Sequence, residues 1–164
     1  MQLAVVLLGS NLGNRLDSIR NALRKLESKL GTAHRISSVY ETASWGVDGL
    51  PDYLNCVAGY YTHLPAAEVL DILLSTEISE GRIRSGKLYE SRIIDLDLLL
   101  LGDSVMHQPV LQIPHPRMTL RRFTMVPLAE IYPEIIHPES GQSMAELLEC
   151  CPDKGIIHKY PQQK

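Results

Sequence analysis

The hydrophobic positions along the chain follow two different periods. Residues 2–8 form a nearly unbroken apolar run, which predicts a buried first strand. Leucine and isoleucine then recur at helical spacing, so residues 14–30 are predicted to form an amphipathic helix that ends at Gly31. The intervening GSNLGN lacks the lysine and spacing of a phosphate-binding loop. We interpret it as a turn in which Asn14 caps the helix.

The middle of the chain alternates between strand-like and helix-like segments. Residues 34–42 and 53–64 are typical of two strands joined by a loop that contains glycine and proline. Pro65 opens a second helix that ends near Gly81. Another strand is expected within residues 91–102. The order β-α-β-β-α-β predicts an α+β, ferredoxin-like sandwich, with helices on one face of an antiparallel sheet and extra helices toward the C-terminus.

Two aspartates interrupt the most apolar of these segments, SRIIDLDLLLLG at residues 91–102. On a strand, Asp95 and Asp97 would project from the same face, about 7 Å apart. An arbitrary D-x-D pair is usually solvated, but the aliphatic neighbours here predict a central strand, where uncompensated charges are costly. Carboxylates at this spacing can hold one or two Mg²⁺ ions. We therefore predict a metal site at Asp95 and Asp97.

A basic segment lies directly before the aspartates. Arg82, Arg84, Lys87 and Arg92 fall within eleven residues that have little hydrophobic pattern. Such a segment is commonly a solvated loop. Beside a metal pair it can also bind polyphosphate, because arginine clamps phosphate oxygens bidentately. Further candidates follow in PHPRMTLRRF: His115, Arg117, Arg121, Arg122 and Phe123.

Tyr53 and Asn55 fall on one face of the strand predicted over 53–64. An aromatic ring beside a side-chain amide suits a flat heterocycle, which stacks on the ring and hydrogen-bonds to the amide. Tyrosine and asparagine on strands are more often structural, so this pair alone is a weak indication of a ligand.

Composition narrows the class of protein. The 164 residues carry a net charge of -3, which excludes a globally basic nucleic-acid surface. Three cysteines are too few and wrongly spaced for a disulfide framework or a zinc site, and no apolar run approaches the length of a membrane span. The apolar start lacks the features of a signal peptide. We expect one cytoplasmic, monomeric domain over 1–164 without nucleic-acid or membrane partners, with flexible loops at about 43–52 and 82–92 and a frayed tail at about 160–164.

Several motifs together resemble the 6-hydroxymethyl-7,8-dihydropterin pyrophosphokinase family. They are GSNLGNR, SSVYET, PDYLN, EISEGRIR, RIIDLDLLLLG, IPHPRM and RRFTMVPLAEIYPE, and they cover about residues 3–137. The most specific part is R-x-I-D-L-D-L-L followed by P-H-P-R-M and R-x-F. The resemblance implies a ferredoxin-like fold. It also implies transfer of the β,γ-pyrophosphoryl group of ATP to the hydroxymethyl group of the pterin, with release of AMP, in folate biosynthesis.

The same resemblance implies roles for individual residues. Asp95 and Asp97 would bind two Mg²⁺ ions together with ATP, and Arg82 and Arg92 would join them in catalysis. The ATP site would comprise Glu77, Arg82, Arg84, Arg92, His115 and Arg121. The pterin site would comprise Thr42, Ala43, Trp45, Tyr53, Asn55 and Phe123, with the rings of Tyr53 and Phe123 on either side of the pterin.

The chain departs from the family pattern in two segments that flank these sites. Family members commonly have tryptophan and Gly-Pro before the signature arginine, and some have a further basic residue. Here Tyr89, Glu90 and Ser91 take the places of tryptophan and Gly-Pro, and Leu88 takes the place of the basic residue. In the other segment, Ala43, Ser44 and Trp45 stand where proline and leucine are frequent. These changes concern loop closure and affinity more than the type of reaction.

Two other functions fit part of the pattern. A Mg²⁺-dependent kinase or nucleotidyl transferase acting on another heterocyclic alcohol would use the same aspartates and arginines, and only Tyr53, Asn55 and Phe123 favour a pterin. A non-catalytic module that binds a metabolite would not need paired metal carboxylates, so Asp95 and Asp97 count against it.

Overall fold

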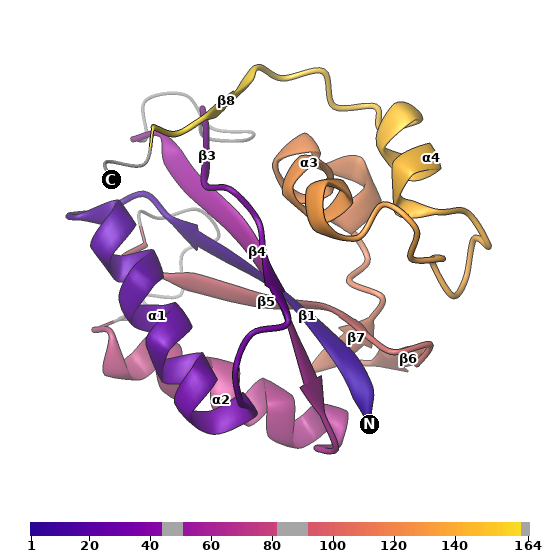
Figure 1. Cartoon of the computed structure of the whole chain (residues 1–164), viewed down its shortest axis with the longest axis horizontal. Coiled ribbons are helices and arrows are strands. Elements are labelled where there is room, and N and C mark those ends of the chain that lie inside the picture. The colour runs from indigo at the N-terminus through magenta and orange to yellow at the C-terminus, as the bar shows by residue number, and fades with distance from the viewer. Residues whose placement is uncertain (44–50, 82–91, 162–164) are drawn as a thin grey trace.

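The structure, a computed structural model, describes residues 1–43, 51–81 and 92–161 and is built around an antiparallel sheet (Figure 1). The strands are β1 (Gln2–Ser10), β2 (Arg35–Ile36), β3 (Tyr40–Thr42), β4 (Tyr53–Thr62), β5 (Asp95–Leu101) and β8 (Ile157–Lys159). They lie in the order β5-β1-β4-β3-β8, and β2 pairs with β4. The helices are α1 (Arg15–Leu30), α2 (Ala66–Ser79), α3 (Arg122–Ile131), α4 (Met144–Glu149) and a 3₁₀ turn (Met118–Leu120). A hairpin of β6 (Met106–Gln108) and β7 (Leu111–Ile113) completes the described chain.

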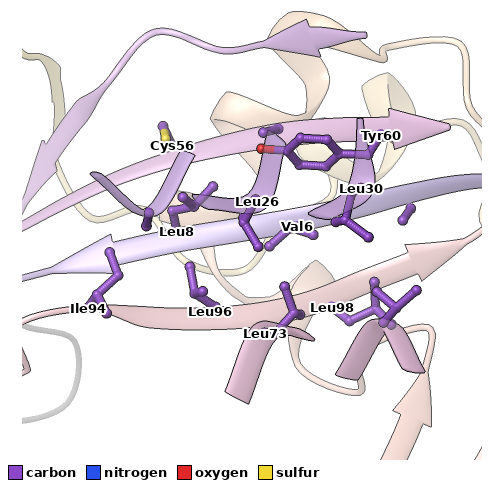
Figure 2. Close-up of a cluster of buried hydrophobic side chains, with 14 of the residues drawn as sticks. Val6, Leu8, Leu26, Leu30, Cys56, Tyr60, Leu73, Ile94, Leu96 and Leu98 are labelled. Atoms are coloured by element: carbon purple, nitrogen blue, oxygen red, sulfur yellow. The ribbon is translucent and has the colours of Figure 1, made fainter. Parts of the chain in front are cut away.

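Helices cover both faces of the sheet. Successive side chains of a strand point to opposite faces. Val6 and Leu8 of β1 therefore pack with Leu26 of α1 and Leu73 of α2, as Figure 2 shows. The alternate residues of β1 belong to a second core cluster with α3 and α4. The predicted mixed fold with an antiparallel sheet is confirmed. The prediction that helices cover one face of the sheet is incomplete, because the C-terminal helices bury the other face.

The ends of α1 follow the sequence prediction closely. The side chain of Asn14 accepts a hydrogen bond from the Asp17 amide at 3.4 Å, and Gly31 ends the helix with a φ of 92°. The single strand predicted over 34–42 is instead divided into β2 and β3. Between β2 and β3, the Ser37 hydroxyl accepts a hydrogen bond from the Val57 amide at 2.9 Å. A side-chain oxygen thus replaces a backbone carbonyl as the acceptor for this amide of β4. Strand β8 was not predicted, because three residues in a polar segment carry no periodic signal.

Strand β5 lies at an edge of the sheet, so the prediction of a central strand is wrong. Among the described strands β5 pairs only with β1. Its leucines are buried nevertheless, because α2 and the second core cluster pack on its two faces. At the outer edge, Glu77 of α2 accepts the Leu96 amide at 2.8 Å. Glu77 is only 1% exposed, so it closes a backbone position that a second strand would otherwise occupy.

None of the helices in the described ranges is long and apolar enough to span a membrane.

Candidate active site

The register of three strands brings the predicted metal-binding aspartates and part of the predicted pterin site onto one sheet face. Gly9 of β1 pairs with Asp95 of β5 on one side and with Asn55 of β4 on the other. Residues that pair directly in a sheet project to the same side, and two strand spacings amount to about 10 Å. A β-carbon at Gly9 would lie 3.0 Å from Asn55 Oδ1. Glycine therefore keeps the space between the amide and the carboxylate open.

Three of the predicted pterin residues are neighbours on β3 and β4. Thr42 pairs with Tyr53, and Asn55 donates a hydrogen bond from Nδ2 to Thr42 Oγ1 at 3.1 Å. This bond fixes the orientation of the Asn55 amide, which is 2% exposed. Ala43 follows β3 and is exposed, whereas the predicted Trp45 lies outside the described residues.

The two aspartates lie in different electrostatic environments. Asp95 Oδ2 accepts a hydrogen bond from Arg92 Nη1 at 2.6 Å. Burial raises the pKa of Asp97 to about 7, with a further contribution from the negative charge of Asp95. Glu77 raises that pKa as well, and Arg121 and Arg92 only partly oppose these effects. Holding both carboxylates ionised thus carries a free-energy cost that a bound cation would remove.

The oxygen donors of this pair suit Mg²⁺, which favours one or two carboxylates together with water and phosphate oxygens. In the ranges 1–43, 51–81 and 92–161, no group of three or more histidine, cysteine, aspartate or glutamate side chains converges as a metal site. An ion at Asp95 and Asp97 would therefore depend on substrate phosphates and water to complete its coordination, which fits a metal that arrives with a nucleotide.

Arg121 links the aspartates to the other predicted contacts. Its charge acts on both Asp97 and His115, and its guanidinium lies 5.5 Å from the centre of the Phe123 ring. Burial, together with Arg121 and Arg117, lowers the pKa of His115 to about 4. His115 Nδ1 accepts the Arg117 amide at 3.2 Å, so the neutral ring carries its proton on Nε2. His115 is thus uncharged at neutral pH and presents an N–H donor at Nε2.

Arg92 and Glu77 flank the aspartates from different sides. Burial lowers the pKa of the Arg92 guanidinium, but Asp95, with smaller contributions from Tyr53 and Asp97, more than offsets this and the pKa is raised overall. Glu77 lies at the outer edge of β5, where it binds the Leu96 amide, so part of its role is structural. Arg82 and Arg84 lie outside the described residues, as do Lys87 to Ser91 and most of both loops predicted to be flexible.

Asn11 is a residue of this region that the sequence interpretation missed. Asn11 is 1% exposed. Its side-chain Oδ1 accepts a hydrogen bond from the Arg92 backbone amide at 2.6 Å, and its backbone amide donates to the Arg92 carbonyl at 3.1 Å. Its Nδ2 donates to the Pro51 carbonyl at 3.3 Å, two residues before Tyr53. One buried side chain thus connects the backbone of Arg92 to the segment that enters β4. Asn11 lies in the GSNLGNR motif directly after a buried strand, but that position does not indicate a bond to Arg92 or Pro51.

We expect Asn11→Ala to lower kcat/KM by about tenfold and to destabilise the protein by about 1–2 kcal/mol, because the buried amide of Arg92 loses its partner. Urea unfolding and steady-state kinetics measure the two effects. Asn14→Ala is the matched control, since it removes an exposed cap from the same turn at a cost of about 1 kcal/mol. Equal kinetics in the two variants would show that Asn11 has no role in the site.

Comparison with known proteins assigns the chain to a family. The family model described as 7,8-dihydro-6-hydroxymethylpterin-pyrophosphokinase (HPPK) matches residues 5–133. A Synechocystis sp. protein named 2-amino-4-hydroxy-6-hydroxymethyldihydropteridine pyrophosphokinase is 41% identical over 147 residues, covering 89% of this chain and 74% of that protein. A Pseudomonas aeruginosa protein of the same name is 35% identical over 157 residues, covering 95% and 96%.

A solved structure has the same fold. The crystal structure of Plasmodium falciparum wild-type HPPK-DHPS with SDX-DHP superposes with a TM-score of 0.74 at 16% sequence identity. The match covers 92% of this chain but only 43% of the Plasmodium chain, so the chain spans less than half the length of that protein. At this identity the similarity concerns the fold alone.

Proposed function

The chain belongs to the 7,8-dihydro-6-hydroxymethylpterin-pyrophosphokinase family, and we propose that it transfers the pyrophosphoryl group of ATP to the hydroxymethyl group of 6-hydroxymethyl-7,8-dihydropterin in folate biosynthesis. The products would be AMP and the pterin diphosphate. The observation that carries the proposal is the register of β5, β1 and β4, which puts a carboxylate pair and a hydrogen-bonded amide on one sheet face.

Each side of the proposed site has a distinct task. Asp95 and Asp97 would hold two Mg²⁺ ions, which when bound supply charge neutralisation and activation of the hydroxyl. Arg92, Arg121 and the neutral His115 would bind phosphate oxygens, and Glu77, Arg82 and Arg84 complete the proposed ATP site. Tyr53 and Phe123 would stack on the pterin ring, with Asn55, Thr42, Ala43 and Trp45 at its edge.

Phosphoryl transfer through a loose transition state depends on in-line positioning and charge stabilisation more than on a strong base. Arg82 and Arg92 would stabilise charge on the migrating group and on the AMP leaving oxygen. Asp97 would accept the hydroxyl proton as it leaves.

The finer features of fold and setting belong to the same proposal. The strand order β5-β1-β4-β3, with α1 and α2 packed on one face, supports a ferredoxin-like arrangement to which α3, α4 and β8 are added. We propose that residues 1–164 act as a single, monomeric domain in the cytoplasm, with ATP and the pterin as its small-molecule partners.

The proposal is tested by the products. Purified protein with ATP, Mg²⁺ and 6-hydroxymethyl-7,8-dihydropterin is expected to form AMP and the pterin diphosphate in equal amounts, as measured by chromatography. Formation of ADP, or AMP release that does not depend on the pterin, would favour a kinase or transferase for another alcohol. Binding of the pterin without turnover would favour the non-catalytic module.

A further inference from the structure

The N-terminal end of α3 carries residues of both proposed substrate sites, yet the helix has no cap of its own. Arg121, which precedes the helix, makes no side-chain capping hydrogen bond, and the first turn contains no acidic residue. The first N–H groups of a helix lack partners within the helix and carry partial positive charge. A partner from elsewhere in the chain is therefore needed to fix the turn that includes Arg121 and Phe123.

Asp153 provides that partner from 31 residues downstream of Arg122. Its Oδ2 accepts the Arg122 amide at 2.9 Å, and its Oδ1 accepts the Gly155 amide at 2.8 Å. The nearby Cys151 is 1% exposed and belongs to the core cluster that α3 and α4 share. One carboxylate thus closes its own turn and caps α3 at the same time, from a segment anchored in the core.

The segment from 151 to 160, which we call the C-terminal strap, continues to the other side of the site. It leaves α4, passes α3 and pairs with β3, as Figure 1 shows. Ile157 lies opposite Thr42, and the Tyr160 amide donates to the Val39 carbonyl at 2.8 Å. The strap therefore joins the start of α3 to β3, the strand that carries Thr42 of the proposed pterin site.

The opposite end of α3 has contacts to the sheet in addition to the ion pair between its Glu130 and Lys159 of the strap, which are 3.2 Å apart. The Tyr132 hydroxyl lies 3.0 Å from His34 Nδ1, and the Tyr132 ring occupies the space that a side chain at Gly59 would need. Losing Asp153 would therefore leave α3 docked on the sheet by its C-terminal end. Only the turn that contains Arg121 and Phe123 would be released.

We propose that Asp153 is a positioning residue of the pyrophosphokinase reaction. It fixes the turn that carries Phe123, whose ring is proposed to stack on the pterin opposite Tyr53, and it acts through α3 without touching substrate. This inference rests on the proposed function. Asp153 lies beyond residues 5–133, the part of the chain that the family model matches, and no role has been assigned to it above.

The test compares Asp153→Ala with Ser143→Ala. Ser143 caps α4 by accepting the Glu146 amide at 3.3 Å, so both variants lose a helix cap and are expected to lose a similar number of degrees in Tm. Asp153→Ala is expected to raise the pterin KM by about tenfold and to change the ATP KM by less than about threefold, since the proposed ATP contacts also come from Arg92 and His115. Ser143→Ala is expected to keep both KM values.

A second variant covers the case in which Asp153→Ala does not fold. Asp153→Asn keeps one acceptor oxygen, so its pterin KM should lie between those of the wild type and Asp153→Ala. In the substrate-free Asn variant, the amide NMR signals of Arg122 and Phe123 should shift. Unchanged signals, or a wild-type pterin KM in either variant, would overturn the role of Asp153. A wild-type enzyme that forms no AMP in this assay refutes the proposed function itself, which separates the two failures.

Discussion

Replacing Asp97 by asparagine is expected to lower kcat by about 10³-fold or more while stabilising the substrate-free protein. The carboxylate is a proposed metal ligand and proton acceptor, and the amide can serve as neither to the same degree. The side chain keeps its shape, so the sheet around β5 should remain intact. Single-turnover measurement of AMP formation gives the rate, and a variant that retains more than a tenth of it would contradict the assignment.

The gain in stability depends on pH in a direction that follows from the pKa. Asp97 has a pKa of about 7 in the folded protein against an ordinary value of 3.8, chiefly because of burial. The unfolded chain therefore loses this proton at a lower pH, and the stability that the group contributes is present below about pH 4 and lost as the pH rises through about 7. Without Mg²⁺, the Tm advantage of Asp97→Asn should be small near pH 4 and largest above pH 7.

A matched control for this variant is Asp103→Asn. Asp103 is exposed in the turn that follows β5, so the same chemical change is made just beyond the end of the strand, away from the proposed site. Its turnover and its dependence of Tm on pH should match those of the wild type. A Tm advantage of Asp97→Asn that is constant from pH 4 to 8 would show that the carboxylate is not strained by burial.

The residues whose environment is set by local periodicity could be predicted from the sequence. The face shared by Tyr53 and Asn55 follows from strand alternation, and the start of α1 follows from Asn14, because each depends on neighbours a few positions away. The placement of Asp95 and Asn55 on the same sheet face, on either side of β1, depends instead on Gly9, which pairs with both. That three-strand register is a property of the assembled sheet.

The errors have a common physical origin in long-range contacts. The aliphatic sequence predicts a central strand, yet β5 lies at the edge, where Glu77 from α2 accepts its Leu96 amide and helices cover its leucines. Asn11 and Asp153 form their decisive bonds across 81 and 31 positions of the chain, respectively. No local pattern encodes such pairs, so the partners of these two polar side chains could not be predicted from the sequence.

Arg92→Ala is expected to lower kcat by about 10²–10³-fold and to change the pterin dissociation constant by less than about threefold. The guanidinium binds Asp95 at 2.6 Å and is proposed to neutralise charge that develops on the phosphates. The hydrogen bonds between Asn11 and Arg92 involve only the backbone of Arg92, so they persist in the variant and keep the backbone at residue 92 in place. The loss should therefore fall on the chemical step, which rapid-quench single-turnover kinetics isolates.

Two further variants separate charge from geometry at this position. Arg92→Lys keeps the positive charge but loses the planar fork that binds two phosphate oxygens, so its rate should lie between those of the wild type and Arg92→Ala. Arg20→Ala removes an arginine whose side chain is 50% exposed on α1 and should leave the rate unchanged. If Arg92 served only to neutralise Asp95, Arg92→Ala would lose stability and keep its single-turnover rate. A lowered rate with an unchanged urea midpoint instead places the guanidinium in the transition state, because an interaction that is stronger there than in the ground state alters kcat.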